Sequence, residues 1–276
     1  MNFKKIISIT IILLLAVSLV GCGGQDAPKE NADGAKVIKV GASPTPHADI
    51  LEKAGELLKE KGYELKVTEF TDYVMPNTAL DEGSIDANYF QHLPYLEDFN
   101  KSHNLDLVSA VKVHFEPLGI YSANLKSLEE LKDGDKIAVP NDPSNEARAL
   151  LLLESAGLIK VDSEKGLNAT PQDIENPRNF QIVELEAASL STSLEDVSLA
   201  VINGNYAIDA DLNPAKDALA SEEKTSLAAD TFANIIAVKN ETKDSDSIKA
   251  LVEVLTSPEM KKFIEEKYEG AVIPVF

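Results

Sequence analysis

The chain has 276 residues and a formal charge of −20 at pH 7, because 46 acidic side chains outnumber 26 basic ones. This acidic balance argues against nucleic acid as a partner and against a basic surface that binds anionic lipid. A single cysteine rules out a disulfide within the chain. We therefore expect packing alone to stabilise either one large domain or two lobes of ordinary size.

The first 21 residues have the parts of a secretory signal peptide. Lys4 and Lys5 precede an uncharged apolar stretch over residues 6–20, which is shorter than the roughly 20 residues of a transmembrane helix. We predict a signal peptide over residues 1–21. Its removal deletes two lysines and no acid, so the formal charge moves from −20 to −22.

The only cysteine follows this stretch directly. Leu19-Val20-Gly21-Cys22 resembles a bacterial lipobox, which implies cleavage before Cys22 and a thioether-linked lipid on it. A chance cysteine after an ordinary signal peptide is the alternative. Residues 23–34 contain three glycines, a proline and no large apolar side chain, so they cannot bury enough surface to become ordered. We predict a lipidated N-terminus and flexible tether over residues 22–36, anchored by more than one acyl chain.

Strands and helices alternate in the next part of the chain. Short runs rich in β-branched residues or alternating in polarity predict strands over residues 37–41, 65–70 and 86–90. Helical spacing predicts helices over residues 51–61, ended by Gly62, and 93–100. A strand, a helix and a strand in this order build a parallel sheet with helices on its faces.

An extended segment over residues 107–122, interrupted by Pro117, precedes a second set of elements. A turn is predicted at residues 141–144. The predicted strands cover residues 136–140, 180–185, 199–202 and 234–238. The predicted helices cover residues 127–131, 146–156, 193–196, 214–220 and 246–268.

Two successive α/β units predict a protein of two lobes. We expect one lobe to comprise residues 37–115 and 231–276, with the late strand and last helix returning to it, and the other to comprise residues 116–230. Periodicity by itself leaves that return open.

Four segments form longer motifs. They read FTDYVMPN at residues 70–77, DANYFQHLPYL at 86–96, VPNDPSNEARAL at 139–150 and AVINGNYA at 200–207. Together with the lipobox, the opening run at 38–44 and the closing run at 270–274, they span nearly all of the mature chain. In this order they resemble the methionine-binding lipoproteins of bacterial ABC importers, the NlpA-like family.

The resemblance implies an α/β, two-lobed, periplasmic-binding-protein-like fold of type II with the ligand cleft between the lobes. In such folds the lobes rotate about crossover segments, here near residues 114–118 and 230–234. It also implies that the chain is a monomeric receptor and not an enzyme, and needs no cofactor. The receptor would pass L-methionine, D-methionine or a methionine-containing dipeptide to the permease and ATPase subunits. The sequence leaves open which of these ligands binds, how many acyl chains Cys22 carries, and whether the protein faces a periplasm or the cell exterior.

The resemblance places eight side chains at the ligand: Tyr73, Phe90, His92, Tyr95, Asn145, Arg148, Asn205 and Asn234. The planar fork of Arg148 suits a carboxylate, and the start of its helix would add amide donors. The amide oxygens of Asn205 and Asn234 would accept from the ammonium group while their nitrogens serve the carboxylate. Without the resemblance, Arg148 is typical of a solvated helix face and Asn203-Gly204-Asn205 of a hairpin turn.

The rings of the first lobe are expected to line a side-chain pocket. A thioether gains about 0.3–1.5 kcal/mol for each contact with an aromatic ring, although leucine-like side chains would also fit. An ordinary core position explains Tyr95 equally well. Tyr89 and Phe90 point to opposite sides if their segment is a strand, so only one of them should face the cleft.

Three other classes of protein are alternatives to this family. A metal-binding lipoprotein is the main rival, but the four histidines, His47, His92, His103 and His114, form no closely spaced ligand pair. The chain contains no Gly-x-Ser-x-Gly, phosphate-binding glycine loop or His-Glu-x-x-His that would indicate an enzyme. A structural or adhesive lipoprotein without binding activity is the third alternative.

Overall fold

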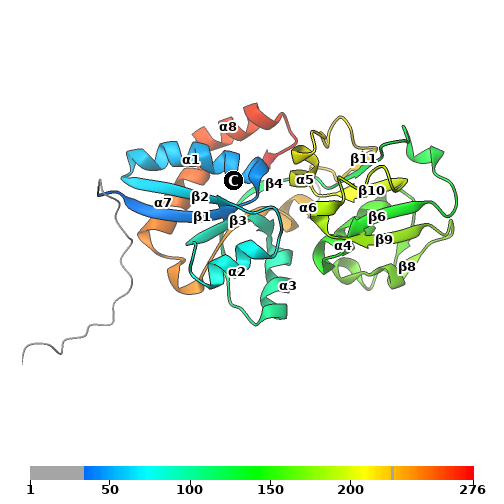
Figure 1. Cartoon of the computed structure of the whole chain (residues 1–276), viewed down its shortest axis with the longest axis horizontal. Helices are drawn as coiled ribbons and strands as arrows, with labels where there is room; N and C mark the ends of the chain where they lie inside the picture. The colour runs from blue at the N-terminus through cyan, green and yellow to red at the C-terminus, as the bar shows by residue number, and fades with distance from the viewer. Residues whose placement is uncertain (1–33, 225–226) are drawn as a thin grey trace, which may run out of the picture.

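The computed structural model describes residues 34–224 and 227–276. The predicted signal peptide, Cys22 and most of the predicted tether lie outside these ranges. The described chain forms two α/β lobes arranged along the long axis, each around its own sheet (Figure 1). None of the described helices combines the length and the apolar character that crossing a membrane requires.

The first lobe is built on a six-stranded sheet of order β13-β4-β12-β3-β1-β2. Its strands are β1 (Lys36–Ala42), β2 (Tyr63–Glu69), β3 (Ala87–His92), β4 (Val108–Phe115), β12 (Asn234–Val238) and β13 (Ile273–Pro274). β1 is parallel to both neighbours, as the strand–helix–strand pattern predicts. β12 lies antiparallel between β3 and β4, so a late strand completes a sheet that the early strands begin.

Helices cover both faces of this sheet (Figure 1). On one side lie α1 (Asp49–Glu60), α7 (Asp246–Leu255) and α8 (Pro258–Tyr268), and on the other α2 (Met75–Asp81) and α3 (Leu93–His103). β12 is apolar throughout because both of its faces are covered. Ile236 packs toward α1 and α7, whereas Ile235 and Ala237 pack toward α2 and α3.

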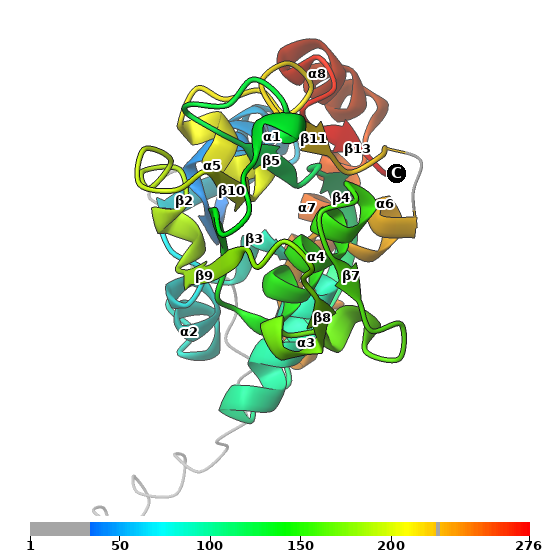
Figure 2. The same cartoon turned by 90° about the vertical axis from the view of Figure 1, so that its right-hand side faces the viewer.

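The second lobe, in front in Figure 2, has a five-stranded sheet of order β11-β5-β10-β6-β9. Its strands are β5 (Gly119–Tyr121), β6 (Lys136–Pro140), β9 (Gln181–Leu185), β10 (Leu199–Ile202) and β11 (Ala220–Ser221), and a separate pair is formed by β7 (Lys160–Val161) and β8 (Ile174–Glu175). The remaining helices are α4 (Pro143–Ser155), α5 (Gly204–Asp209) and α6 (Leu227–Thr231). α4 contributes a row of buried leucines and alanines to the core on one face of the sheet.

Three helix predictions are wrong. The segment 193–196 forms turns, and 214–220 forms turns that lead into β11. There Asn213 and Asp217 hydrogen-bond to backbone amides at 2.7–2.8 Å, and such local bonds compete with a helix. The helix predicted over 246–268 is two helices, because Ser257 caps α8 and Pro258 cannot continue α7.

The turn predicted at 141–144 and the alternative hairpin turn at 203–205 are both helix starts. Asp142 is the N-cap of α4, and its carboxylate accepts a hydrogen bond from the amide of Asn145 at 3.0 Å. Asn203 is the N-cap of α5, so the Asn203-Gly204-Asn205 run begins a helix and does not form a hairpin.

The chain crosses between the lobes twice. The first crossover, residues 116–118, joins β4 to β5, and the second, residues 222–233, joins β11 to β12. They are bonded to each other, because the amide of Glu222 donates to the carbonyl of Leu118 at 3.0 Å. In its described part, the chain thus passes between the two sheets through neighbouring, mutually bonded segments, a geometry that suits rotation of one lobe against the other.

Candidate functional site

A cavity lies between the lobes, and the side chains that line it leave little free volume in this structure. It is lined by all eight side chains that the resemblance implies. Four further residues complete the lining: Gln91, Glu116, Asn203 and Gly204. The structure therefore brings together side chains from β3, α3, α4, α5, β12 and the first crossover.

One end of the cavity is aromatic. The ring centre of Tyr73 lies 5.8 Å from those of both Phe90 and Tyr95. The Tyr95 hydroxyl donates to the carbonyl of Tyr73 at 2.8 Å, which fixes the loop before α2 over the pocket. Of the adjacent pair on β3, Phe90 lines the cavity, and Tyr89 points away to bond His114.

Several hydrogen bonds cross the cavity from lobe to lobe. The Tyr73 hydroxyl donates to the side-chain oxygen of Asn205 at 2.5 Å. Nε2 of His92 lies 3.2 Å from the side-chain oxygen of Asn145. Tyr206 of α5, which the sequence reasoning missed, places its ring 5.0 Å from that of Tyr73. These contacts hold the lobes together over the aromatic end.

Gln91 belongs to a buried amide cluster and offers no free group to a ligand. Its side-chain nitrogen donates to Asn77 at 2.7 Å and to Asn88 at 2.9 Å, and its oxygen accepts from Asn77 at 2.9 Å. The cluster ties α2 to β3. It thereby fixes Tyr73, just before α2, relative to Phe90 on β3.

Arg148 lies at the opposite, charged end and is only 4% exposed, so a solvated helix face is the wrong interpretation. Its Nε and Nη2 atoms donate to the carboxylate of Glu222 at 2.8 and 2.6 Å, and Nη2 also donates to the carbonyl of Glu116 at 2.9 Å. The guanidinium carbon lies 4.3 Å from the ring centre of Phe232. Nη1 makes no hydrogen bond to the part of the chain that the structure describes, and it remains available in the cavity.

Asn205 and Asn234 offer nitrogens and not oxygens to the cavity. The oxygen of Asn205 accepts from Tyr73, while its buried nitrogen lacks a partner among the described residues. The oxygen of Asn234 lies 3.0 Å from Nε2 of His47. Each of these oxygens already has one partner within the protein, and the nitrogen of Asn205 is the amide atom left as a free donor among the described residues.

Asn145 is a bridge between protein groups. Its side-chain oxygen accepts hydrogen bonds from Nε2 of His92 and, at 2.8 Å, from the side-chain nitrogen of Asn203. Its own nitrogen donates to both carboxylate oxygens of Asp142. Asp142 also caps α4, so the start of this helix already holds an anion and is not the predicted anion site. Asn203 keeps a buried oxygen without a partner among the described residues.

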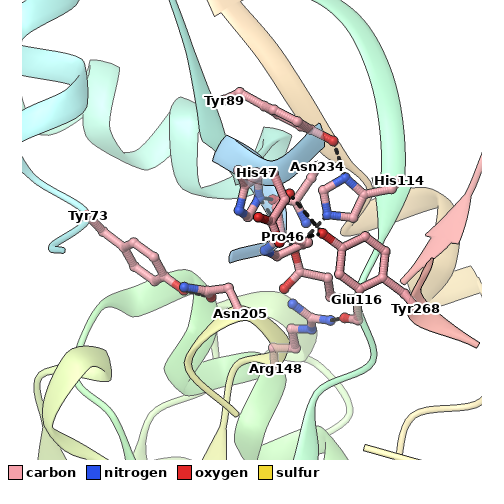
Figure 3. A network of polar contacts seen from close by, with 11 residues as sticks. Pro46, His47, Tyr73, Tyr89, His114, Glu116, Arg148, Asn205, Asn234 and Tyr268 are labelled. Atoms are coloured by element: carbon pink, nitrogen blue, oxygen red, sulfur yellow. Dashed lines mark hydrogen bonds and ion pairs between the residues drawn. The ribbon is translucent and has the colours of Figure 1, made fainter. Parts of the chain in front are cut away.

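Glu116 is the charged residue of the cavity that the sequence reasoning missed. It lies on the first crossover and is 5% exposed. Its carboxylate accepts from Nε2 of His114 at 2.6 Å, lies 3.4 Å from Nε2 of His47, and accepts the backbone N–H of Asn205 (Figure 3). Burial raises the pKa of Glu116, and the nearby positive charge of Arg148 opposes that rise.

The surroundings of Glu116 fix its orientation. Because the carboxylate of Glu116 can only accept, Nε2 of His114 carries the proton and donates to it, which leaves Nδ1 to accept from the Tyr89 hydroxyl (Figure 3). A Cβ on Gly204 would lie 2.6 Å from Cβ of Glu116, a distance that real Cβ atoms do not show. Only glycine at position 204 therefore lets α5 approach this carboxylate.

His47, His114 and Glu116 are also the one group among the described residues whose ligand atoms lie close enough, within 4.8 Å, to hold a metal. Sequence spacing could not indicate this cluster, because His47 and His114 are far apart in the chain. The 2.6 Å separation of Nε2 and the carboxylate oxygen is a hydrogen-bond distance and is shorter than the spacing of two ligands on one zinc ion. We assign the histidines to orienting Glu116.

Buried neutral histidines predict a pH-dependent stability term. Burial lowers the pKa of His92 to about 3, so its stabilising contribution is present above pH 6.5 and is lost as the pH falls toward 3. At pH 5 the loss amounts to about 2 kcal/mol of the free energy of unfolding. In urea unfolding of the ligand-free protein, the wild type should lose about that much more than His92→Asn between pH 7 and pH 5. The exposed His103→Asn is the control, and equal losses in wild type and His92→Asn would contradict the assignment.

A cavity with a charged and an aromatic end, enclosed by two α/β lobes on paired crossovers, is typical of a substrate-binding protein. The chain belongs to the NlpA lipoprotein family, which it matches over residues 38–276. It is 45% identical to the methionine-binding lipoprotein MetQ of Bacillus subtilis over 277 residues, 99% of each chain. The family and the fold class predicted from the sequence are confirmed.

Two solved structures show the same fold. A nutrient-binding protein from Burkholderia cenocepacia, bound to methionine, is 47% identical with a TM-score of 0.83 over 87% of this chain and 100% of its own. An ABC transporter periplasmic substrate-binding protein from Coxiella burnetii is 44% identical with a TM-score of 0.81 over 86% of this chain and 100% of its own. Membership of a lipoprotein family agrees with the lipobox, and lipidation of Cys22 stays a prediction.

Proposed function

We propose that this protein captures methionine and delivers it to an ABC importer, anchored by lipid on Cys22 at the extracytoplasmic face of the cell membrane. The observation that carries the proposal is the cavity, which sets Arg148 and Glu116 at one end and rings at the other. Methionine offers a carboxylate, an ammonium group and a thioether to match. The methionine-bound relative from Burkholderia supports the same ligand.

The free polar atoms suggest how the ligand's charged groups are met. Burying a zwitterion is costly unless each charge finds a partner. Nη1 of Arg148 and the unpartnered nitrogen of Asn205 suit the carboxylate. Glu116 and the unpartnered oxygen of Asn203 suit the ammonium group. The thioether then lies toward the aromatic end, where a soft sulfur packs well against rings.

Closure and delivery follow from the two-lobe design. We take residues 37–115 with 231–276, and residues 116–230, as the units that move. The bonds from Tyr73 to Asn205 and from His92 to Asn145 would form on closing and break on release. The protein would act as a monomer that presents the closed form to the permease, whose ATPase subunits supply the energy.

Binding to the purified lipoprotein in detergent tests the function. After unfolding and refolding to remove bound ligand, L-methionine should raise the melting temperature, with about 2.7 kcal/mol of stabilisation at 100 times the dissociation constant. Leucine is the matched control for apolar size. A stronger response to D-methionine or glycyl-methionine would reassign the ligand within the class. No response to any of these compounds would refute the proposal.

A further inference from the structure

Glu222 on the second crossover holds the only arginine of the cavity. Its two carboxylate oxygens accept from Nε and Nη2 of Arg148 at 2.8 and 2.6 Å, and the two side chains are 5% and 9% exposed. This is a two-pronged, charge-assisted contact, which fixes the plane of a guanidinium group as well as its position. No motif marked Glu222 in the sequence.

The same carboxylate is bonded to the first crossover. Glu222 accepts a hydrogen bond from the backbone amide of Leu118 at 2.9 Å, and its own amide donates to the carbonyl of Leu118 at 3.0 Å. Phe232, also on the second crossover, lies against the guanidinium group at 4.3 Å. Arg148 is therefore oriented by the crossovers and not by its own helix.

Resting on the proposed function, we propose that Glu222 is a positioning residue that aims Nη1 of Arg148 at the ligand carboxylate. Without it, the flexible arginine side chain would have to be ordered at the moment of binding, which weakens affinity. A second effect opposes this one, because the negative charge of Glu222 repels the ligand carboxylate. Orientation outweighs repulsion, so removal of Glu222 weakens methionine binding.

Calorimetry of L-methionine binding to the lipoprotein tests this. Glu222→Ala should weaken binding at least about tenfold, and Glu222→Gln, which keeps an acceptor for Nη2 and for Leu118, should lie between it and the wild type. Lysine has no plane to orient, so adding Glu222→Ala to Arg148→Lys should cost less than about threefold. The exposed Glu195→Gln in the second lobe is the charge-matched control.

Three results would overturn the proposal. They are unchanged or tighter binding by Glu222→Ala, an equal loss in Glu222→Gln and Glu222→Ala, and an undiminished loss in the Arg148→Lys background. The last would show that Glu222 acts only by joining the crossovers. The wild type tests methionine binding by itself, so the two proposals can fail separately.

A second measurement does not need a ligand. The chain has two arginines, Arg148 and Arg178, so the spectrum of arginine labelled with ¹⁵N contains two Nε–H signals. In the ligand-free wild type the Arg148 proton should exchange slowly with water, and in Glu222→Ala it should exchange as fast as a solvated arginine. Slow exchange in the variant would show that other contacts orient Arg148, and the Arg178 signal is the internal reference.

Discussion

Arg148→Ala is expected to weaken L-methionine binding by at least about 100-fold, or close to 3 kcal/mol, because each hydrogen bond to a charged group contributes about 1.5–3 kcal/mol. Nη1 is the one guanidinium nitrogen without a partner among the described residues. The substitution leaves the ligand carboxylate buried in the cavity without its cation, and it also leaves Glu222, at 9% exposure, without its partner. Calorimetry of the ligand-free, refolded lipoprotein measures the first effect and urea unfolding the second.

The other arginine provides the control for this prediction. Arg178 lies in the same lobe, pairs with Asp133 at 2.9 Å near the surface and is 35% exposed. Arg178→Ala removes the same charge and should leave methionine binding within about twofold of the wild type, because exposed ion pairs contribute little. If Arg148→Ala and Arg178→Ala bound methionine equally well, Arg148 would not hold the carboxylate.

Glu116→Gln is expected to weaken L-methionine binding at least about tenfold, since it replaces the carboxylate that faces the ammonium group with a neutral amide of the same shape. Glutamine can still accept from His114, so the cavity should keep its form. The wild type should also show a pH dependence. Burial raises the pKa of Glu116, and the affinity should fall as the pH drops through that raised value and the carboxylate becomes protonated.

A ligand without the positive charge makes this test specific. N-acetyl-L-methionine keeps the carboxylate and the thioether but has no ammonium group, so the wild type should reject it. Because the preference for methionine depends on Glu116, it should shrink in Glu116→Gln. An unchanged preference would assign the ammonium group to Asn203 alone. Glu195→Gln, exposed and remote from the cavity, controls for the loss of one negative charge.

Much of the fold could be predicted because its elements have local causes. Strands at 136–140, 199–202 and 234–238 are found with the predicted bounds, since continuous apolar runs of that length suit strands covered on both faces. The helix predicted over 214–220 is wrong because Asn213 and Asp217 bond the neighbouring backbone. The Asn203-Gly204-Asn205 run begins α5 and sets Gly204 against the distant Glu116, a contact that local composition does not record.

The site shows the same division between local and distant causes. All eight side chains predicted from the motifs line one cavity. The motifs could not show which of their polar atoms have no hydrogen-bond partner there among the described residues. Which atoms are free depends on hydrogen-bond partners far along the chain. The Tyr73 hydroxyl donates to the oxygen of Asn205, 132 positions away, and the carboxylate of Glu222 accepts from two nitrogens of Arg148, 74 positions away. Glu116 has no motif because only the fold brings the distant His47 to it and to the neighbouring His114.

By itself the sequence indicated the class of this protein: it predicts an export signal and a lipobox, and it records the alternating strands and helices and the residue types that meet at the cleft. Each of these is recorded in short runs, where spacing and composition act on neighbouring residues. The tertiary structure alone decided how hydrogen bonds are distributed among those residues. Among the described residues it leaves one nitrogen of Arg148 without a partner, and it sets the carboxylate of Glu116 in the cavity lining. Such a distribution depends on distances between atoms that only the packed chain brings within 3 Å of each other, about the length of a hydrogen bond.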